Sequence, residues 1–248
     1  MKNKYIISFK NGFQQQLLEK EQIVGRLIIY SFITLLFSQI CKGAGASSIQ
    51  FLYYGMTQVI CLSTSLVAFH IAQDMQNEQF SQFLLRPINY LLYRLCEAMG
   101  ISLLRYVTLF AIYLLITYCT LGRLPYHCFS GAVLGIMAVF LNTLLSLLIG
   151  LFSFWIKEIK SIFYLNMTAT FCYGGLIVPL ELYTSHMRII SFCTPYPWIL
   201  WSPAQHIVRE SSLFLYSIFG WLFWSIILAM VLLYVYKKCL RLFIRGTR

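Results

Sequence analysis

The stretch that decides the fold is Phe129–Trp155, FSGAVLGIMAVFLNTLLSLLIGLFSFW, a run of 27 residues without a charged side chain. A bilayer core about 30 Å thick needs about 20 predominantly apolar residues in one helix. This run is therefore long enough to cross a membrane as a tilted helix. It also contains a carboxamide, Asn142, well inside its apolar length.

Further apolar runs of near-spanning length lie on both sides of this stretch. They are Ile23–Cys41, Ile49–Ala72, Gly100–Leu121, Ile162–Val178 and Leu213–Tyr236. Together with Phe129–Trp155 they predict an all-α integral membrane protein with six transmembrane helices. We expect a helix in the membrane interface at residues 1–22, the spanning domain at 23–236, and a basic tail at 237–248.

The composition excludes a water-soluble domain. Hydrophobic residues make up 59% of the 248 residues, charged residues make up 11%, and the mean hydropathy is +0.73. Globular domains carry about 25% charged residues because their surface has to face water. The net charge of +11 lies beside the apolar runs, as phospholipid contact and membrane topology require, so nucleic acid is not an expected partner.

The basic residues also predict the orientation. Of the Lys and Arg residues, 15 fall on one side of the predicted spans, with Arg26 and Arg105 counted among them, and 4 fall on the other. Positive residues accumulate in cytoplasmic loops. We therefore predict that both termini lie in the cytoplasm, which agrees with an even number of spans.

The N-terminal segment is amphipathic. Its apolar residues Ile6, Phe9, Phe13 and Leu17 recur every three or four positions. This period predicts a helix lying on the cytoplasmic leaflet. A flexible tail is the alternative.

The connection from Gln73 to Glu97 also has a helical apolar period. Pro87 removes a backbone donor and disfavours helix at Arg86. The segment therefore predicts two short helices, one lying flat and one rising into the third span, with the character of a docking surface. Arg94 and Glu97 are spaced as an ion pair at the membrane edge.

The segment from Val178 to Glu210 contains four prolines among large aromatic residues. It is too interrupted to span and too apolar for a free loop. We expect short re-entrant or interfacial helices on the outer side.

The sequence lacks the motifs of a catalytic site. It has no G-x-x-x-x-G-K-[ST], no H-E-x-x-H and no G-x-S-x-G, so no catalytic, cofactor-binding or metal-ligating residues are assigned. Asn142 and the pair Gly131 and Gly135 serve either helix packing or a polar pathway. No pathway of buried charges appears in the spans, which argues against an ion-driven carrier.

Four stretches in order carry a resemblance to a known family. They are Leu84-Leu85-Arg86-Pro87 with Tyr93-Arg94, Phe154-Trp155 with Glu158, Gly174-Gly175 through Pro179-Leu180, and Pro195-Tyr196-Pro197 with Pro203-Ala204. The set resembles type 2 ABC transporter permeases, and more closely the bacterial viologen-exporter-like subgroup. The chain departs from that pattern at Gln76, Glu78, Ser81 and Thr184.

The resemblance implies the transmembrane subunit of an ATP-driven exporter in the bacterial cytoplasmic membrane, forming half of the translocation pathway. Its partners would be ABC ATPase subunits, which bind ATP and Mg, a second permease chain, like or unlike, and membrane lipid. The ATPase-coupling residues would be Asp74, Glu78, Phe83, Leu84, Arg86, Pro87 and Arg94. The outer gate or dimer contact would be Gly174, Gly175, Pro179 and Glu181.

Two other functions fit the same composition. One is a membrane anchor or assembly subunit of the same fold that transports nothing. The other is a membrane-embedded enzyme acting on lipid, which lacks a converging catalytic set. A neighbouring gene for a P-loop ATPase would favour the exporter.

Overall fold

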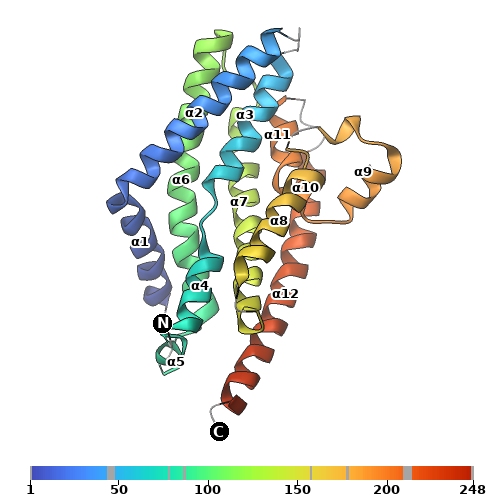
Figure 1. Cartoon of the computed structure of the whole chain (residues 1–248). Coiled ribbons are helices and arrows are strands. Elements are labelled where there is room, and N and C mark those ends of the chain that lie inside the picture. The colour runs from blue at the N-terminus through green and yellow to red at the C-terminus, as the bar shows by residue number, and fades with distance from the viewer. Residues whose placement is uncertain are drawn as a thin grey trace.

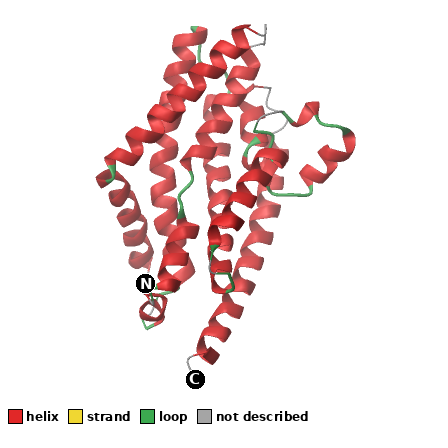
Figure 2. Cartoon of the chain, in the orientation of Figure 1, coloured by secondary structure: helices red, strands yellow, loops and turns green. Residues whose placement is uncertain are grey.

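The computed structural model describes residues 2–43, 48–77, 79–85, 88–156, 158–176, 179–208 and 214–246, and within them every regular element is a helix (Figure 2). The long helices are α2 (Lys20–Gly43), α3 (Ser48–Ser63), α6 (Tyr90–Leu121), α7 (Cys128–Leu151) and α12 (Phe214–Gly246). The shorter helices are α1 (Lys2–Leu18), α4 (Val67–Gln76), α5 (Gln79–Leu84), α8 (Ile159–Tyr173), α9 (Ser185–Phe192), α10 (Tyr196–Ile199) and α11 (Trp201–Val208), with 3-10 turns η1 (Phe152–Phe154) and η2 (Leu180–Leu182).

The all-α membrane fold is confirmed. Five segments of the described chain are long and apolar enough to cross a bilayer, namely Lys20–Cys41, Ile49–Gln76, Tyr90–Leu121, Cys128–Phe154 and Phe214–Leu242. The run predicted as the fifth span forms α8, which has 15 residues. At 1.5 Å per residue it is about 22 Å long, less than a bilayer core. A sixth span therefore stays a prediction.

The second predicted span is not one continuous helix. α3 ends at Ser63, Thr64–Leu66 is non-helical, and α4 begins at Val67. The hydroxyl groups of Ser63 and Thr64 donate to the carbonyl oxygens of Ile60 (2.8 Å) and Cys61 (2.9 Å). Side chains that bond to nearby backbone in this way compete with the helix and satisfy the carbonyls at its end. We call residues 64–66 the helix break.

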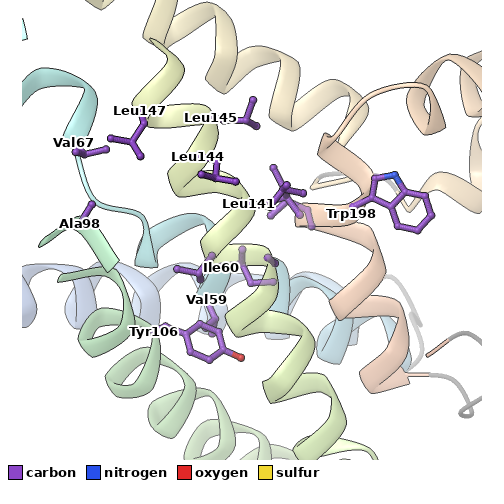
Figure 3. Packing of buried hydrophobic residues seen from close by; sticks show 14 of the residues in the cluster. Val59, Ile60, Val67, Ala98, Tyr106, Leu141, Leu144, Leu145, Leu147 and Trp198 are labelled. Carbon is purple, nitrogen blue, oxygen red and sulfur yellow. The ribbon is translucent and has the colours of Figure 1, made fainter. Parts of the chain in front are cut away.

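The centre of the bundle is α7. In Figure 3, Leu144 and Leu147 of α7 lie between Val67 of α4 and the Trp198 region of α10. Tyr106 and Tyr113 of α6 are buried and donate their hydroxyl groups to backbone carbonyls on neighbouring helices, at Ala132 (3.1 Å) and Leu52 (3.2 Å). A buried Tyr needs such a partner for its hydroxyl group, and each bond fixes one helix against another.

Two glycines of α7 are points of close helix approach. A Cβ at Gly135 would lie 2.1 Å from the Tyr106 hydroxyl oxygen, and one at Gly131 would lie 2.2 Å from the side chain of Ile207. Both glycines therefore admit a neighbouring side chain that a larger residue would exclude. These contacts are helix packing of the kind the G-x-x-x-G spacing allows.

α1 packs along the first half of α6. A Cβ at Gly12 would meet the Glu97 carbonyl oxygen at 2.2 Å, and one at Gly100 would meet the Phe9 carbonyl oxygen at 2.3 Å. The predicted apolar stripe faces away from the bundle, where Ile6 is 64% exposed. Figure 1 shows α1 running beside α6 and meeting α2 at residue 19, three residues before the predicted boundary. Its placement on a leaflet stays a prediction.

The two ends of the bundle contain different helix ends and connections. The start of α1, the end of α12 and α5 all lie at the lower end in Figure 1, whereas the α6–α7 connection lies at the upper end. The segment after α8 folds into the short helices η2, α9, α10 and α11. α11 is buried against α3 and α7, while α9 stands away from the bundle (Figure 1). Short helices were expected here, although their depth in a bilayer stays a prediction.

Candidate functional site

A buried ionic cluster joins α4 to α6 at the lower end of the bundle. The Asp74 carboxylate accepts hydrogen bonds from the Tyr90 hydroxyl (2.5 Å), from Arg94 Nε (2.8 Å) and from Arg94 Nη2 (2.5 Å). Asp74 is 2% exposed and Arg94 is 8% exposed. Carboxylate bonds to two guanidinium nitrogens fix direction as well as distance. The cluster therefore holds α4 and α6 in one relative position.

Arg94 has a second carboxylate partner. Its Nη1 lies 2.5 Å from Glu97 Oε2, three residues further along α6. This is the helix-spaced ion pair that the sequence predicted, and it is confirmed. The contact to Asp74 was not foreseen, because the two residues are 20 positions apart and lie on different helices. We call Asp74, Tyr90, Arg94 and Glu97 the coupling cluster.

α5 rests on the coupling cluster through aromatic side chains. The Phe83 ring centroid is 5.4 Å from that of Tyr90 and 5.2 Å from that of Tyr93, and Arg94 Cζ lies 5.5 Å from the Phe83 centroid. Phe80, which is buried, packs edge-on against Tyr90 at 5.0 Å. Aromatic and cation–π contacts of this kind prefer defined geometries. A displacement of α5 therefore acts on the cluster directly.

Part of the predicted coupling surface cannot be placed. Glu78, Arg86 and Pro87 lie outside the described residues, and of Leu84 only the backbone is described. α5 ends at Leu84, and the side chain of Leu85 is 88% exposed. Of the seven predicted coupling residues, Asp74, Phe83 and Arg94 therefore come together at one place. Their role in coupling stays a prediction.

α4 connects the coupling cluster to the helix break. Its buried residues face α7, where a Cβ at Gly150 would lie 2.8 Å from Ile71 Cδ1 and 3.2 Å from Ala68 Cα. The cluster holds the far end of α4 at Asp74, and the break begins three residues before Val67. α4 is thus a rigid segment of ten residues with a buried ionic contact at one end and non-helical backbone at the other.

A small polar cavity adjoins the break. It has a volume of about 20 Å³, and α7, α8 and the helix break all contribute to its wall. Its polar lining residues are Thr64, Ser65, Asn142, Ser146, Asn166 and Thr170. A cavity of this size holds about one water molecule. Non-helical backbone at membrane depth is tolerated where it lines a cavity, so the break and the cavity belong together.

Two atoms at this cavity show its polar character. Ser65 Oγ is buried and has no hydrogen-bond partner among the described residues. The Asn166 carboxamide oxygen accepts from the Tyr196 hydroxyl at 3.1 Å, which ties α8 to α10. Asn142 is 9% exposed and faces this space from α7. The structure therefore places Asn142 at a polar cavity, whereas Gly131 and Gly135 lie in helix contacts.

The predicted outer gate is held by contacts within the chain. Gly175 has a φ of 74°, a left-handed conformation that favours glycine, and its carbonyl oxygen accepts from the Tyr53 hydroxyl at 2.7 Å. A Cβ at Gly174 would lie 3.0 Å from Leu200 Cδ1. Pro179 and Glu181, together with Tyr53, line a pocket of about 210 Å³ at this end. Contact with a second chain here stays a prediction.

Two arginines lie deeper than the topology count implied. Arg26 belongs to α2 and Arg105 to α6, and both fall within the candidate spans. Arg105 is 5% exposed. The candidate spans therefore contain a buried basic side chain. That no pathway of buried charges crosses them stays a prediction. The count of basic residues assigned both to the cytoplasmic side, although Arg26 lies in the predicted span Ile23–Cys41 and Arg105 in the predicted span Gly100–Leu121.

A buried histidine lies near the upper end of the bundle. His206 Nε2 lies 2.8 Å from Ser130 Oγ, and the ring centroids of His206 and His127 are 5.7 Å apart. Burial lowers the pKa of His206, and the neighbouring His127 lowers it further. His206 is therefore held neutral at pH 7 between α7 and α11.

A family model described as ABC-2 family transporter protein matches residues 23–245 of the chain. The match covers the helical bundle from α2 to the end of α12. Among curated proteins, the search found no match.

Proposed function

Because the chain belongs to the ABC-2 family of transporter proteins, we propose that it is the transmembrane subunit of an ATP-driven exporter coupled to a separate ATPase subunit. The chain is a multi-pass membrane permease component of an ABC transporter. In this proposal the chain forms half of the translocation pathway and pairs with a second permease chain, like or unlike. The proposal also places both termini in the cytoplasm of a bacterial inner membrane, in a protein related to viologen-exporter-like permeases.

The observation that carries the coupling proposal is the contact of α5 with a buried ionic cluster. α5, at the lower end of the bundle, contacts the cluster through its own Phe83 ring, which packs against Tyr90, Tyr93 and Arg94. Arg94 in turn holds Asp74 on α4. An ATPase subunit that moves α5 would therefore move α4 and the start of α6 together.

The route continues from α4 to the cavity. The helix break separates α4 from α3, so α4 can shift without carrying the outer part of the same span with it. Thr64 and Ser65 of the break line the polar cavity together with Asn142. Movement at α5 would in this way change the shape of this polar space between α7, α8 and the helix break. ATP and Mg would be bound by the ATPase partner, and this chain would supply the moving wall.

The experiment that tests the proposal reverses a charge on the coupling surface. Arg86→Glu, with the chain still inserted, is expected to weaken co-purification of the ATPase subunit encoded nearest to this gene, or to uncouple its hydrolysis. Arg123→Glu is the matched control, because Arg123 is exposed at the opposite end of the bundle, between α6 and α7. Equal binding and coupling in both variants would contradict the proposal.

The same experiment addresses the alternative of a non-transporting anchor. An anchor would retain its ATPase partner and would show no change in hydrolysis rate when the permease is added or altered. A transport subunit changes the rate, because its conformational equilibrium is linked to nucleotide binding. If Arg86→Glu still assembles with the ATPase but no longer changes its hydrolysis rate, the result supports the exporter and excludes a non-transporting anchor.

A further inference from the structure

Two guanidinium groups, one half-buried and one buried, donate to backbone carbonyls at the end of α3 and in the helix break. Arg26 Nη1 donates to the Leu62 carbonyl oxygen, and Arg105 Nη1 donates to the Thr64 carbonyl oxygen (3.1 Å). These carbonyls lie at the C-terminal end of α3, where the helix dipole favours positive charge. The dipole explains why basic groups are tolerated here. It amounts to about half a charge, and two full charges are present.

The remaining hydrogen-bond partners of Arg105 are neutral. Arg105 Nε donates to Gln16 Oε1 (2.6 Å) and Arg105 Nη2 donates to Gln22 Oε1 (2.9 Å). No described carboxylate lies within ion-pairing distance of either guanidinium, since the salt bridges found among the described residues belong to Arg94. Glu19 is close enough for its charge to act on Arg105, and it accepts a hydrogen bond from Gln15. Buried charge normally requires a paired counter-charge.

A third donor at this place has no partner. Gln16 is fully buried, and its amide Nε2 makes no hydrogen bond with the described residues. Its Oε1 is already committed to Arg105, so the amide cannot be reversed without losing that bond. Gln16, Arg26 and Arg105 therefore bring together two cations and an unsatisfied N–H donor. What is missing is a negatively charged group rich in acceptors.

The depth of the cluster fits a lipid headgroup. Arg105 lies sixteen residues before Leu121, the last residue of α6, which is about 24 Å along the helix axis. The hydrocarbon core is about 30 Å thick, so Arg105 lies near the boundary of the opposite leaflet. The α1–α2 junction opens to the surface there, with Gln22 exposed and Leu18 84% exposed. A phospholipid can approach through this junction.

We propose that Arg26, Arg105 and Gln16 form a binding site for the phosphate group of an anionic phospholipid, drawn from the leaflet at the α1 end of the bundle. Phosphate oxygens would accept from the free guanidinium hydrogens and from Gln16 Nε2 and would neutralise the positive charge held there. The acyl chains would lie along the exposed apolar face of α2, where Ile28 and Phe32 are 63% and 64% exposed. The bound lipid would fix the α1–α2 junction against the helix break.

The test compares lipids and variants in the purified full-length chain. In nanodiscs of phosphatidylcholine with one-third phosphatidylglycerol, native mass spectrometry is expected to show a retained phosphatidylglycerol molecule, and the thermal midpoint is expected to exceed that in pure phosphatidylcholine. Arg26→Gln should weaken retention about tenfold, the effect of losing one charge-assisted hydrogen bond. Lys10→Gln is the matched control, because Lys10 is exposed on α1 near the same end. It should leave retention unchanged.

Three results would overturn the site. Equal retention in Arg26→Gln and the unaltered chain would do so, and so would an equal loss in Lys10→Gln, which would indicate a diffuse basic surface. An equal rise in thermal midpoint from inorganic phosphate alone would remove the lipid from the proposal. If Arg26→Gln does not fold, photo-crosslinking phosphatidylglycerol to the unaltered chain decides: adducts in residues 16–32 support the site, and adducts only elsewhere contradict it.

Discussion

Arg94 and Arg105 are both buried arginines on α6, eleven residues apart, and their surroundings are opposite in kind. Arg94 is held between two carboxylates, Asp74 and Glu97. Arg105 is held by carbonyl and carboxamide oxygens, with Arg26 close by. The first arrangement satisfies its charge within the chain, and the second does not. Arg94 therefore holds two helices together, whereas Arg105 belongs to the proposed binding site for a phosphate group.

The comparison predicts a large loss when a carboxylate is removed from the coupling cluster. Asp74→Ala leaves the Arg94 guanidinium buried with one carboxylate instead of two and breaks the contact between α4 and α6. Removing one partner of a buried ion pair costs about 3–5 kcal/mol. Thermal unfolding in detergent should therefore show a lower midpoint for Asp74→Ala than for a substitution at Arg105 or Glu97. A midpoint equal to that of the unaltered chain would show that the cluster does not join the two helices.

A smaller loss is expected at the other arginine. Arg105→Gln leaves the Thr64 carbonyl and the carboxamides of Gln16 and Gln22 without their donor, but it strands no buried counter-charge. Unsatisfied neutral groups cost about 1–3 kcal/mol. In pure phosphatidylcholine the midpoint of Arg105→Gln should lie above that of Asp74→Ala. The reverse order would mean that Arg105, not Arg94, is the principal electrostatic contact of the bundle.

These two arginines also show which contacts can be predicted from the sequence and which cannot. The apolar runs predicted a membrane bundle because length and hydropathy are local properties. The i,i+3 spacing predicted the Arg94–Glu97 pair for the same reason. The contact with Asp74 depends on how α4 packs against α6, and no local pattern encodes that. Arg105 was counted with the cytoplasmic residues, because the basic-residue rule uses the position of a residue in the sequence and not its burial in the assembled bundle.

The helix break shows another limit. Residues 63–65, Ser-Thr-Ser, contain neither proline nor glycine and lie inside an otherwise apolar run. Hydropathy therefore predicted one continuous span. At the break, hydroxyl groups bond back to their own helix, and Arg26 and Arg105 reach the carbonyls of Leu62 and Thr64 from other helices. Such tertiary partners appear only when the helices are assembled.

A still smaller effect is expected at the second carboxylate of the coupling cluster. Glu97→Gln removes one charge, while Arg94 keeps its hydrogen bonds to Asp74 and the new carboxamide oxygen can still accept one from Arg94. The expected loss is about 1 kcal/mol, or about 2–4 °C in the thermal midpoint. If Glu97→Gln lowers the midpoint as much as Asp74→Ala does, the three charged groups of the cluster act as one unit, and the contact between α4 and α6 has no special weight.

The smallest predicted effect depends on pH and concerns the upper end of the bundle. Because burial lowers the pKa of His206 in the folded chain, the unfolded chain binds its proton first as pH falls. Stability is therefore complete above the unfolded pKa of about 6.5 and is lost progressively below it. The thermal midpoint should fall between about pH 7.5 and about pH 5. His206→Gln should flatten this dependence, and His186→Gln, on the outlying α9, should not.

The central claim is that α5 acts on the bundle through its aromatic contact with the coupling cluster, and Phe83→Ala tests it most directly. The change removes the ring between α5 and Arg94 without unpairing a charge. Phe192→Ala is the matched control, because Phe192 on α9 packs against Trp201 of α11, away from α4 and α5. The measurement is ATP hydrolysis by the reconstituted complex, with and without this chain. We predict that Phe83→Ala assembles normally but loses most of the permease-dependent change in rate, while Phe192→Ala retains it. Full permease dependence in a folded, assembled Phe83→Ala complex would contradict the claim.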